Sequence, residues 1–298
     1  RLMRFTASDP SEPDQGGRVG REPVGPVEWS RRAIISILTE VLPDQAGSLT
    51  ILGGHAVMPR CPQTFGLVLP TSDGDFAVTP IRVNDQPSFT DALRSAGFEP
   101  RDSSRPGLWG RGRRDASGLV SWDEQIDFLC PGSLTGNVGR SRRSVTVLKT
   151  THGTAAVGVA DGIELATVDR GPVMITDIAD PSRSVEANVA GIPALVCAKS
   201  YKLGERLERI ATRPQRVLPK DFGDLFLLMA NSDPEETAQV FNRHSDDSPT
   251  GKAIALGRRH FANVLRSPIA LSIWREATEQ ILPDGVLADL LSAWRRYF

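Results

Sequence analysis

The apolar and polar positions divide the chain into three stretches of different pattern. Residues 6–28 are rich in Pro, Gly, Asp, Glu and Ser and hold almost no large apolar side chain, which is typical of a flexible or loosely docked leader. Between residues 29 and 190, short apolar runs typical of strands alternate with segments whose apolar residues have helical spacing. From residue 191 onward, segments with helical spacing dominate. The pattern therefore predicts an α+β protein, with a leader over residues 1–28, a mixed lobe over 29–190 and a helical lobe over 191–298.

Individual elements follow from the same spacing and from Pro and Gly at their ends. In the mixed lobe the expected helices are Trp29–Val41, Gly53–Arg60 and Ser88–Ala96. The expected strands are Leu49–Leu52, Leu108–Arg114, Leu119–Trp122, Ile126–Leu129, Ser144–Leu148, Val157–Val159, Ile163–Val168 and Val173–Ile175. The helical lobe is expected to begin with a long helix from Ala194 and to continue with helices Asp221–Met229, Glu235–Phe241, Thr250–Leu265, Ile269–Ile281 and Val286–Tyr297.

Two acids and two glycines form the most informative motif of the chain. Asp73 and Asp75 stand at i and i+2 before the apolar run Phe76–Val78, so both carboxylates point to the same side of an extended strand. A pair held in this way can bind Mg²⁺, which takes oxygen ligands and bridges to substrate phosphates. Gly53 and Gly54 directly follow the first expected strand, and without side chains their N–H groups can approach a triphosphate closely.

An ordinary turn is the alternative for Asp73-Gly74-Asp75, because Asp and Gly are the commonest turn formers. Two apolar runs favour the strand instead: Leu49–Leu52, which leads into the two glycines, and Phe76–Val78, which follows Asp75. A third carboxylate is available at Asp127, which stands inside the strand-like run Gln125–Leu129 and is costly to bury unless it is paired or metal-bound. Asp123 and Glu124 precede that run, and we expect them at a turn or on the surface.

A second block of candidate residues lies on two expected helices. Lys199 follows the apolar residues Val196–Ala198, and a lysine in such surroundings either reaches water or meets an anion. Lys202 is one turn further on and is the second candidate. Asp221 and Asp224 stand at i and i+3 on one helix face. Asp221 could fix the lysine or lie near the acceptor, or it could simply complement the helix dipole.

Together these motifs resemble the nucleotidyltransferase superfamily with the DNA polymerase β fold. In that superfamily a Gly-Gly or Gly-Ser motif opens a helix, an Asp-x-Asp pair follows on a strand, and a third acid comes later. The block Gly191–Arg206, followed by Pro219–Leu225, is similar to the AbiEii/MenT group of toxin nucleotidyltransferases. The likeness covers roughly residues 45 to 230, with both blocks in order. The chain departs from many relatives at Leu69, where they carry Arg, and at Gly74, where they carry an aliphatic residue.

The resemblance implies an activity and a set of site residues. Residues 29–190 would be the catalytic lobe, and the protein would be a Mg²⁺-dependent nucleotidyltransferase that adds NMP from an NTP to the 3′ end of tRNA. It would act as a toxin held in check by a cognate antitoxin. The implied catalytic residues are Asp73, Asp75, Asp127, Lys199 and Asp221, the first three being the metal ligands. The implied nucleotide-binding residues are Gly53, Gly54, Thr71, Ser72, Lys199 and Lys202.

The residues themselves support only NMP transfer and leave two rival interpretations open. One is transfer of NMP to a protein or a small molecule. The other is a non-catalytic nucleotide-binding relative. Three groups of arginines are candidate contacts to RNA phosphates, or else ordinary solvated surface: Arg111, Arg113 and Arg114; Arg140, Arg142 and Arg143; and Arg206, Arg209, Arg213 and Arg216. For His55, local packing or capping is the favoured interpretation over a nucleotide contact.

Charge, cysteine content and apolar run lengths indicate which partners and which cell compartment to expect. The formal charge of −1 is near neutral, so nucleic acid would be bound locally and not over the whole surface. The three cysteines are far apart and odd in number, which favours a reducing compartment and hence the cytoplasm. No apolar run approaches the length of about 18 residues that a membrane span requires, so no membrane partner is expected.

Overall fold

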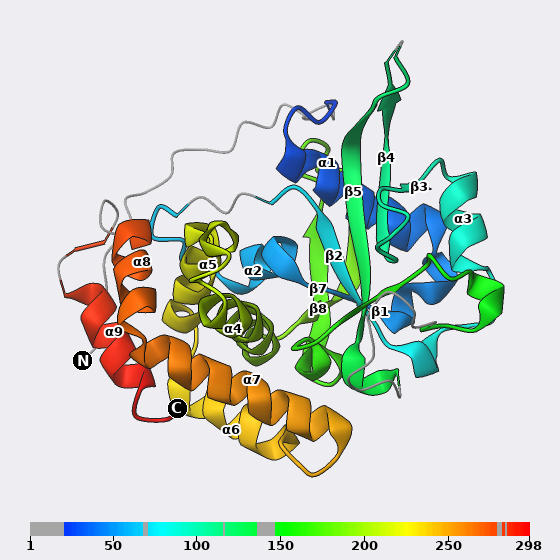
Figure 1. The fold of residues 1–298 in the computed structure, drawn as a ribbon. Helices are drawn as coiled ribbons and strands as arrows, with labels where there is room; N and C mark the ends of the chain where they lie inside the picture. The colour runs from blue at the N-terminus through cyan, green and yellow to red at the C-terminus, as the bar shows by residue number, and fades with distance from the viewer. Residues whose placement is uncertain (1–20, 68–70, 116, 136–146, 279–281, 284) are drawn as a thin grey trace.

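The computed structural model of the protein describes residues 21–67, 71–115, 117–135, 147–278, 282–283 and 285–298. In this part of the chain, eight strands form one sheet in the order β3-β4-β5-β2-β1-β8-β7, with β6 beside the end of β5 (Figure 1). The strands are β1 (Leu49–Ile51), β2 (Gly74–Val78), β3 (Glu99–Pro100), β4 (Leu108–Arg114), β5 (Val120–Pro131), β6 (Gly158–Ala160), β7 (Arg170–Thr176) and β8 (Ser184–Ala190).

The sheet mixes both strand directions. The pairs β1–β8, β2–β5 and β5–β6 are parallel, and the pairs β1–β2, β3–β4, β4–β5 and β7–β8 are antiparallel. The predicted α+β class with a mixed sheet is therefore confirmed. All described strands precede residue 191, and every helix from residue 192 onward belongs to the helical part.

Helices lie beside the sheet and make up the C-terminal part (Figure 1). None of the described helices is both long enough and apolar enough to cross a membrane. The helices are α1 (Pro26–Ser36), which continues as a π-helical turn over Ile37–Val41, α2 (Gly53–Arg60), α3 (Phe89–Ser95), α4 (Ile192–Glu208), α5 (Pro219–Ala230), α6 (Pro234–His244), α7 (Pro249–Arg266), α8 (Pro268–Thr278) and α9 (Val286–Trp294).

The face of the sheet that α1 covers is the apolar one. Side chains alternate between the two faces of a strand, and Gly74 and Phe76 of β2 share the face on which Ile34 of α1 packs. On this face Phe76 stacks on Phe128 of β5, with ring centroids 5.4 Å apart. Asp75 lies between Gly74 and Phe76 in β2 and therefore points to the opposite face. The packing of α1 thus sets the direction of the candidate metal ligand.

Most of the expected elements are present. The helices predicted at 53–60, 88–96 and 221–229 correspond to α2, α3 and α5, and the strand predicted at 108–114 has the bounds of β4. Ser88 caps α3 by accepting from Asp91 N, and Gly97 follows with φ +82°, as its predicted role as a helix stop requires. The two strands predicted at 119–122 and 126–129 form one strand, β5.

Two predictions about residues 123–168 are wrong. Glu124 is buried inside β5, not at a turn or the surface, and its Oε2 accepts from Arg111 Nη2 at 2.7 Å. The strand expected over 163–168 is a 3₁₀ turn over Glu164–Thr167. Leu165 and Ala166 of the turn are buried, and the Glu164 carboxylate accepts from Gly162 N at 2.7 Å and ties the segment into a turn.

Some expectations fall on residues outside the description. These are residues 1–20 of the leader, Leu69, residues 144–146 of the strand expected at 144–148, and Arg140, Arg142 and Arg143. Val147 and Leu148, the remaining part of that expected strand, are not in a strand. Arg21, at the start of the described chain, donates its N–H to Ala179 O at 3.0 Å.

Candidate active site

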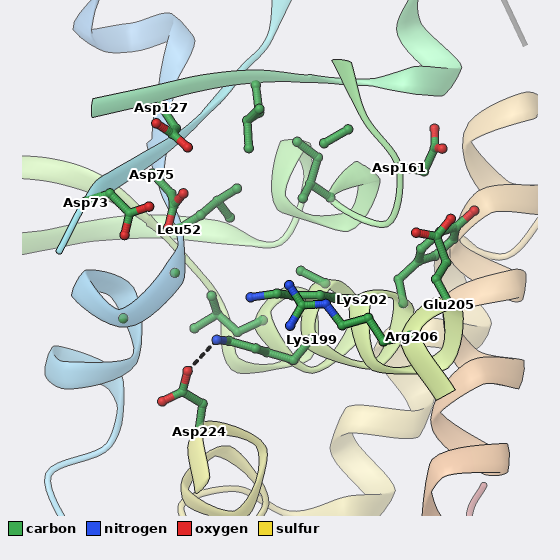
Figure 2. Close-up of a pocket in the computed structure, with 18 of the residues that line it drawn as sticks. Leu52, Asp73, Asp75, Asp127, Asp161, Lys199, Lys202, Glu205, Arg206 and Asp224 are labelled. Carbon is green, nitrogen blue, oxygen red and sulfur yellow. Dashed lines mark hydrogen bonds and ion pairs between the residues drawn. The ribbon is translucent and has the colours of Figure 1, made fainter. Parts of the chain in front are cut away.

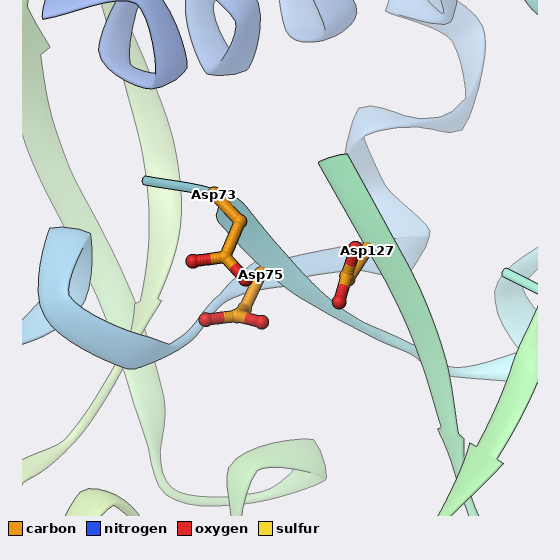
Figure 3. A group of neighbouring side chains, drawn as sticks. All are labelled: Asp73, Asp75 and Asp127. Atoms are coloured by element: carbon orange, nitrogen blue, oxygen red, sulfur yellow. The ribbon is translucent and has the colours of Figure 1, made fainter. Parts of the chain in front are cut away.

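Three carboxylates predicted from the sequence lie together at the sheet. Asp75 of β2 and Asp127 of β5 are direct partners in the parallel register, and Asp73 immediately precedes β2. One carboxylate oxygen from each of the three lies within 4.8 Å of the others, and Figure 3 shows the side chains pointing toward a common space. This acid triad, Asp73, Asp75 and Asp127, is an all-oxygen donor set of the kind that hard divalent cations prefer.

The electrostatics of the acid triad favour a bound cation. Burial, together with the nearby charges of Asp73 and Asp127, raises the pKa of Asp75 to about 8. Burial and the charge of Asp73 raise the pKa of Asp127 to about 6, although Arg101 beside it lowers that pKa. Three half-buried carboxylates that repel one another need a positive charge to ionise together. The residues therefore fit a divalent metal ion, and their oxygen donors would suit Mg²⁺ among others.

Two glycines let the start of α2 approach the acid triad. Gly53 has φ +62°, and a Cβ added there would lie 2.0 Å from Asp75 Oδ2. A Cβ added at Gly54 would lie 2.9 Å from the Cβ of Thr71. The Thr71 hydroxyl in turn donates to the carbonyl of Asp73 at 3.1 Å. Only glycine fits this contact between the helix start and the acids.

The glycine between the two acids is also explained by packing. A Cβ at Gly74 would lie 2.6 Å from Ile34 Cγ1 and 2.7 Å from Ile126 Cδ1. These two isoleucines fill the space that a larger residue would occupy, and the register of β2 against β5 continues without a shift through Gly74, Asp75 and Phe76. The strand therefore keeps regular geometry at the acid pair despite the glycine.

Arg101 is a site residue that the sequence reasoning missed. Its guanidinium Nη2 forms an ion pair with Asp127 Oδ1, and its Nε donates to Trp109 O at 3.1 Å. Arg101 and Asp127 are 26 residues apart; Arg101 follows β3, which pairs with β4, and Leu108 of β4 is the register partner of Asp127. The contact fixes the orientation of one carboxylate of the triad. A signal in the sequence would have required the strand register, which no local pattern gives.

A cavity of about 420 Å³ opens in front of the acid triad. Gly53, Gly54 and Thr71 line it, and Figure 2 shows Lys199, Lys202 and Arg206 of α4 across from the triad. Ser72, the remaining predicted nucleotide contact, is exposed and is not part of the lining. Acids on one wall and cations on the other match the two charges of a metal–triphosphate complex.

The lysines of α4 are held by the acids of α5. Asp221 is fully buried and accepts from Lys199 Nζ at 3.1 Å, from Lys202 Nζ at 2.9 Å and from Arg206 Nη1 at 2.7 Å. Lys199 also forms an ion pair with Asp224. Burial raises the pKa of Asp221, but the three cations outweigh that effect and hold it well below its usual range. Asp221 thus does fix the lysine, as one interpretation of the sequence proposed.

This network gives the predicted residues different positions. Lys199 and Lys202 line the cavity, whereas Asp221 does not and lies behind them. Asp224, which the sequence reasoning noted but did not assign to the site, does line the cavity. Burial disfavours the charged form of Lys199, but Asp224 and Asp221 reverse that effect and raise its pKa. Lys199 therefore stays charged at the cavity wall.

The arginine groups differ sharply in their surroundings. Arg111, Arg113 and Arg114 each form an ion pair, with Glu124, Asp123 and Glu99 respectively. In the third group, Arg206 joins Asp221, while three further members are exposed at the cavity and have no carboxylate within ion-pair distance among the described residues: Arg209, Arg213 and Arg216. We name these three the arginine rim.

His55 has a structural position. Its Nε2 lies 2.7 Å from Ser30 Oγ, and its Nδ1 accepts from Arg31 Nε at 3.0 Å. Burial and the charge of Arg31 lower the pKa of His55 to about 3, so the ring is neutral. With Nδ1 accepting, Nε2 carries the proton and donates to Ser30. His55 thus joins α2 to α1, which confirms the predicted packing role.

Comparisons of the chain with known protein families, with curated proteins and with solved structures found no match.

Proposed function

We propose that the protein is a metal-dependent nucleotidyltransferase, with a core of the DNA polymerase β type, that moves NMP from an NTP to an acceptor hydroxyl. The observation that carries this proposal is the pairing, across one cavity, of the acid triad with the cations of α4 (Figure 2). A carboxylate triad alone would suit many metal-binding sites. The opposing lysines and arginine add a surface for phosphates, and the cavity is large enough for a mononucleotide.

Asp73, Asp75 and Asp127 would hold the metal ion, and Mg²⁺ suits their donor set. When bound, Mg²⁺ would neutralise charge on the phosphates and on the leaving pyrophosphate. Lys199 and Lys202 would neutralise the triphosphate from the other wall. Asp221 keeps both lysines in place, since its two oxygens are shared among three cations. The Gly53-Gly54 start of α2 presents backbone N–H groups beside the acids.

The chemical step requires a base as well as charge. The acceptor hydroxyl oxygen forms a bond to the α-phosphorus, the bond from that phosphorus to the bridging oxygen breaks, and pyrophosphate leaves. Asp127 is suited to take the hydroxyl proton, because its carboxylate lies with those of Asp73 and Asp75 at the wall of the cavity that would hold the metal ion. Arg101 holds that carboxylate in position.

The arginine rim supports a nucleic-acid acceptor. Its three side chains are exposed at the cavity mouth and have no acidic partner in the described part of the chain, so they are available to phosphates. The resemblance to AbiEii/MenT toxins extends the proposal to the 3′ end of tRNA and to a cognate antitoxin as partner. The ion pairs of Arg111, Arg113 and Arg114 make that group a weaker candidate for RNA contact.

Transfer of label tests the proposal directly. The protein is incubated with Mg²⁺ and each α-labelled NTP, together with total tRNA, total protein or neither. We expect label in tRNA and release of pyrophosphate. Asp75→Asn should abolish both, whereas Asp247→Asn, which removes an exposed acid far from the triad in sequence, should retain them. Label in protein would show that the acceptor is a protein and not tRNA. Absence of transfer with every acceptor would contradict the enzymatic proposal.

A further inference from the structure

The segment that leaves α2 is hydrogen-bonded to the end of α5. Asn231 is the C-terminal cap of α5, and its side-chain Oδ1 accepts from Gln63 N at 3.1 Å while its Nδ2 donates to Gln63 O at 2.9 Å. One side chain thus binds both backbone polar groups of Gln63. The Nδ2 also donates to Leu227 O at 2.9 Å, which fixes the amide on its own helix. The contact joins two segments that are 168 residues apart in the sequence.

A turn with an unusual backbone adds a second contact between the same two elements. Phe65 has φ +52°, a conformation that bulky side chains rarely adopt, and Gly66 follows with φ +79°. Leu67 N closes the turn by donating to Thr64 O at 2.9 Å. The ring of Phe65 packs edge-on against the ring of Phe226 in α5, with centroids 5.6 Å apart. The strained backbone therefore places an aromatic ring on α5, although Phe65 remains 41% exposed.

Both helices joined in this way reach the cavity, and they lie side by side (Figure 1). The first helix, α2, begins at the cavity with Gly53, which lies against the Asp75 carboxylate. The second helix, α5, contributes Asp224, which forms the ion pair with Lys199 (Figure 2). Burial and the charge of Asp224 raise the pKa of the Cys61 thiol to about 12, because the end of α2 is close to α5. One helix thus belongs to the wall with the acid triad, and the other supports the wall with the lysines.

We infer that Asn231 is a positioning residue for the transfer reaction, an inference that rests on the proposed nucleotidyltransferase function. Its contact with Gln63 holds α5 in place beside α2, and so holds Lys199 at a fixed distance from the acid triad. A metal ion by itself contacts only the triad, whereas a metal–triphosphate complex contacts both walls. A small misplacement of one wall weakens the ligand that needs both. Asn231 therefore affects binding of the complex and not binding of the metal ion alone.

Binding of two probes tests this role without requiring turnover. Calorimetry would measure Mg²⁺ alone and the Mg²⁺ complex of inorganic tripolyphosphate, which has no base. We expect Asn231→Ala to bind Mg²⁺ with unchanged affinity and the complex about 10-fold more weakly, the effect of losing two hydrogen bonds. Ser232→Ala is the matched control, because it removes a bond at the same end of α5, to Leu228 O at 2.6 Å, that does not reach α2. Phe65→Asn tolerates a positive φ and loses only the ring contact, and it should also weaken the complex selectively.

The possible results separate the positioning role from the proposed function. If Asn231→Ala weakens both probes by the same factor, or neither, the residue only supports the fold and the inference is wrong. An equal selective loss in Ser232→Ala would also overturn it, because damage to the end of α5 would then be sufficient. If Asn231→Ala does not fold, the ratio of the two affinities in Phe65→Asn decides in the same way. Failure of the unaltered protein to bind the complex at all would overturn the proposed function itself.

Discussion

Replacing Asp75 with Asn isolates the effect of holding three acids together. Asn has nearly the shape of Asp, so it keeps the close contact with Gly53, where an added Cβ would lie 2.0 Å from Asp75 Oδ2. The substitution removes the charge and leaves the volume. We expect the metal-free Asp75→Asn variant to be more stable than the unaltered protein near pH 7, although it should lose NMP transfer. A gain in stability with a loss of activity is the pattern of a functional site under electrostatic strain.

The sign and size follow from the pKa of Asp75. Burial and the two neighbouring acids raise that pKa from 3.8 to about 8. At a pH between 3.8 and about 8, the folded protein keeps a proton on Asp75 that the unfolded chain releases. The stability that the unaltered protein has with Asp75 protonated is therefore complete below about pH 4 and is lost as the pH rises through about 8. At pH 7 the difference in Asp75 pKa between the folded and unfolded states lowers the free energy of unfolding by at most about 4 kcal/mol. Because the carboxylate is only half-buried, we expect a gain of roughly 1–4 kcal/mol for Asp75→Asn, and almost none at pH 4.

Unfolding measurements over pH and metal concentration test this reasoning. Urea and thermal unfolding in chelator would compare Asp75→Asn with the control Asp247→Asn from pH 4 to pH 8. A gain of this size corresponds to a rise in Tm of several degrees for a chain of this length. Adding Mg²⁺ at about ten times its dissociation constant should stabilise the unaltered protein by about 1.4 kcal/mol. The Asp75→Asn variant should respond much less, because it lacks one of the three ligands.

Two results would refute the argument. If Asp75→Asn is no more stable than the unaltered protein at pH 7 to 8 in chelator, the acids do not repel one another as their positions require. If Mg²⁺ stabilises Asp75→Asn and the unaltered protein equally, the cation binds elsewhere. A stability gain in Asp247→Asn of the same size would show that general surface charge, not the acid triad, is responsible.

Three further predictions concern the other walls of the cavity. Gly53→Ala should displace the Asp75 carboxylate and sharply reduce both Mg²⁺ affinity and transfer, whereas Gly47→Ala, which has open space for its methyl group, should leave both unchanged in binding and transfer assays. Lys199→Ala should lower kcat/KM by an amount equivalent to about 2–4 kcal/mol and destabilise the fold by about 3–5 kcal/mol. Lys202→Ala, at a half-exposed site, should have smaller effects in both measurements; equal small effects would place both lysines outside the site. The charge of the arginine rim is reversed by combining Arg209→Glu, Arg213→Glu and Arg216→Glu. This variant should have a higher acceptor KM that depends less on salt concentration, with unchanged NTP binding.

Local patterns predicted the elements that present the acids and glycines. The helix over Gly53–Arg60 and the strand over Leu108–Arg114 have the predicted bounds, because Gly-Gly after an apolar strand and alternating residues between turns are local signals. The spacing of Asp73 and Asp75 predicted that they share a side of the chain. The grouping of Asp127 with them followed from its cost of burial, and the parallel register of β2 with β5 accounts for it physically.

Long-range pairing is what the sequence could not supply. The strand β8 (Ser184–Ala190) was missed, because its sequence Ser-Val-Glu-Ala-Asn-Val-Ala is only weakly apolar, yet it pairs with both β1 and β7. The apolar residues of 163–168 predicted a strand, but Glu164–Thr167 form a 3₁₀ turn in which the Glu164 carboxylate accepts from Gly162 N. The ion pair of Arg101 with Asp127 was missed for a similar reason, because it depends on strand register and no local propensity encodes that register.

Among the described residues, no ion pair crosses the cavity between the acid triad and the cations of α4. On the sheet side, the acid triad has Arg101 as its ion-pair partner among the described residues, which leaves it with excess negative charge. On the other side, Asp221 and Asp224 hold Lys199 in place, and the arginine rim adds exposed positive charge. Like charges held close together lower stability in the absence of a ligand. A ligand that carries both a cation and phosphates removes both penalties at once, and a metal–nucleotide complex is such a ligand.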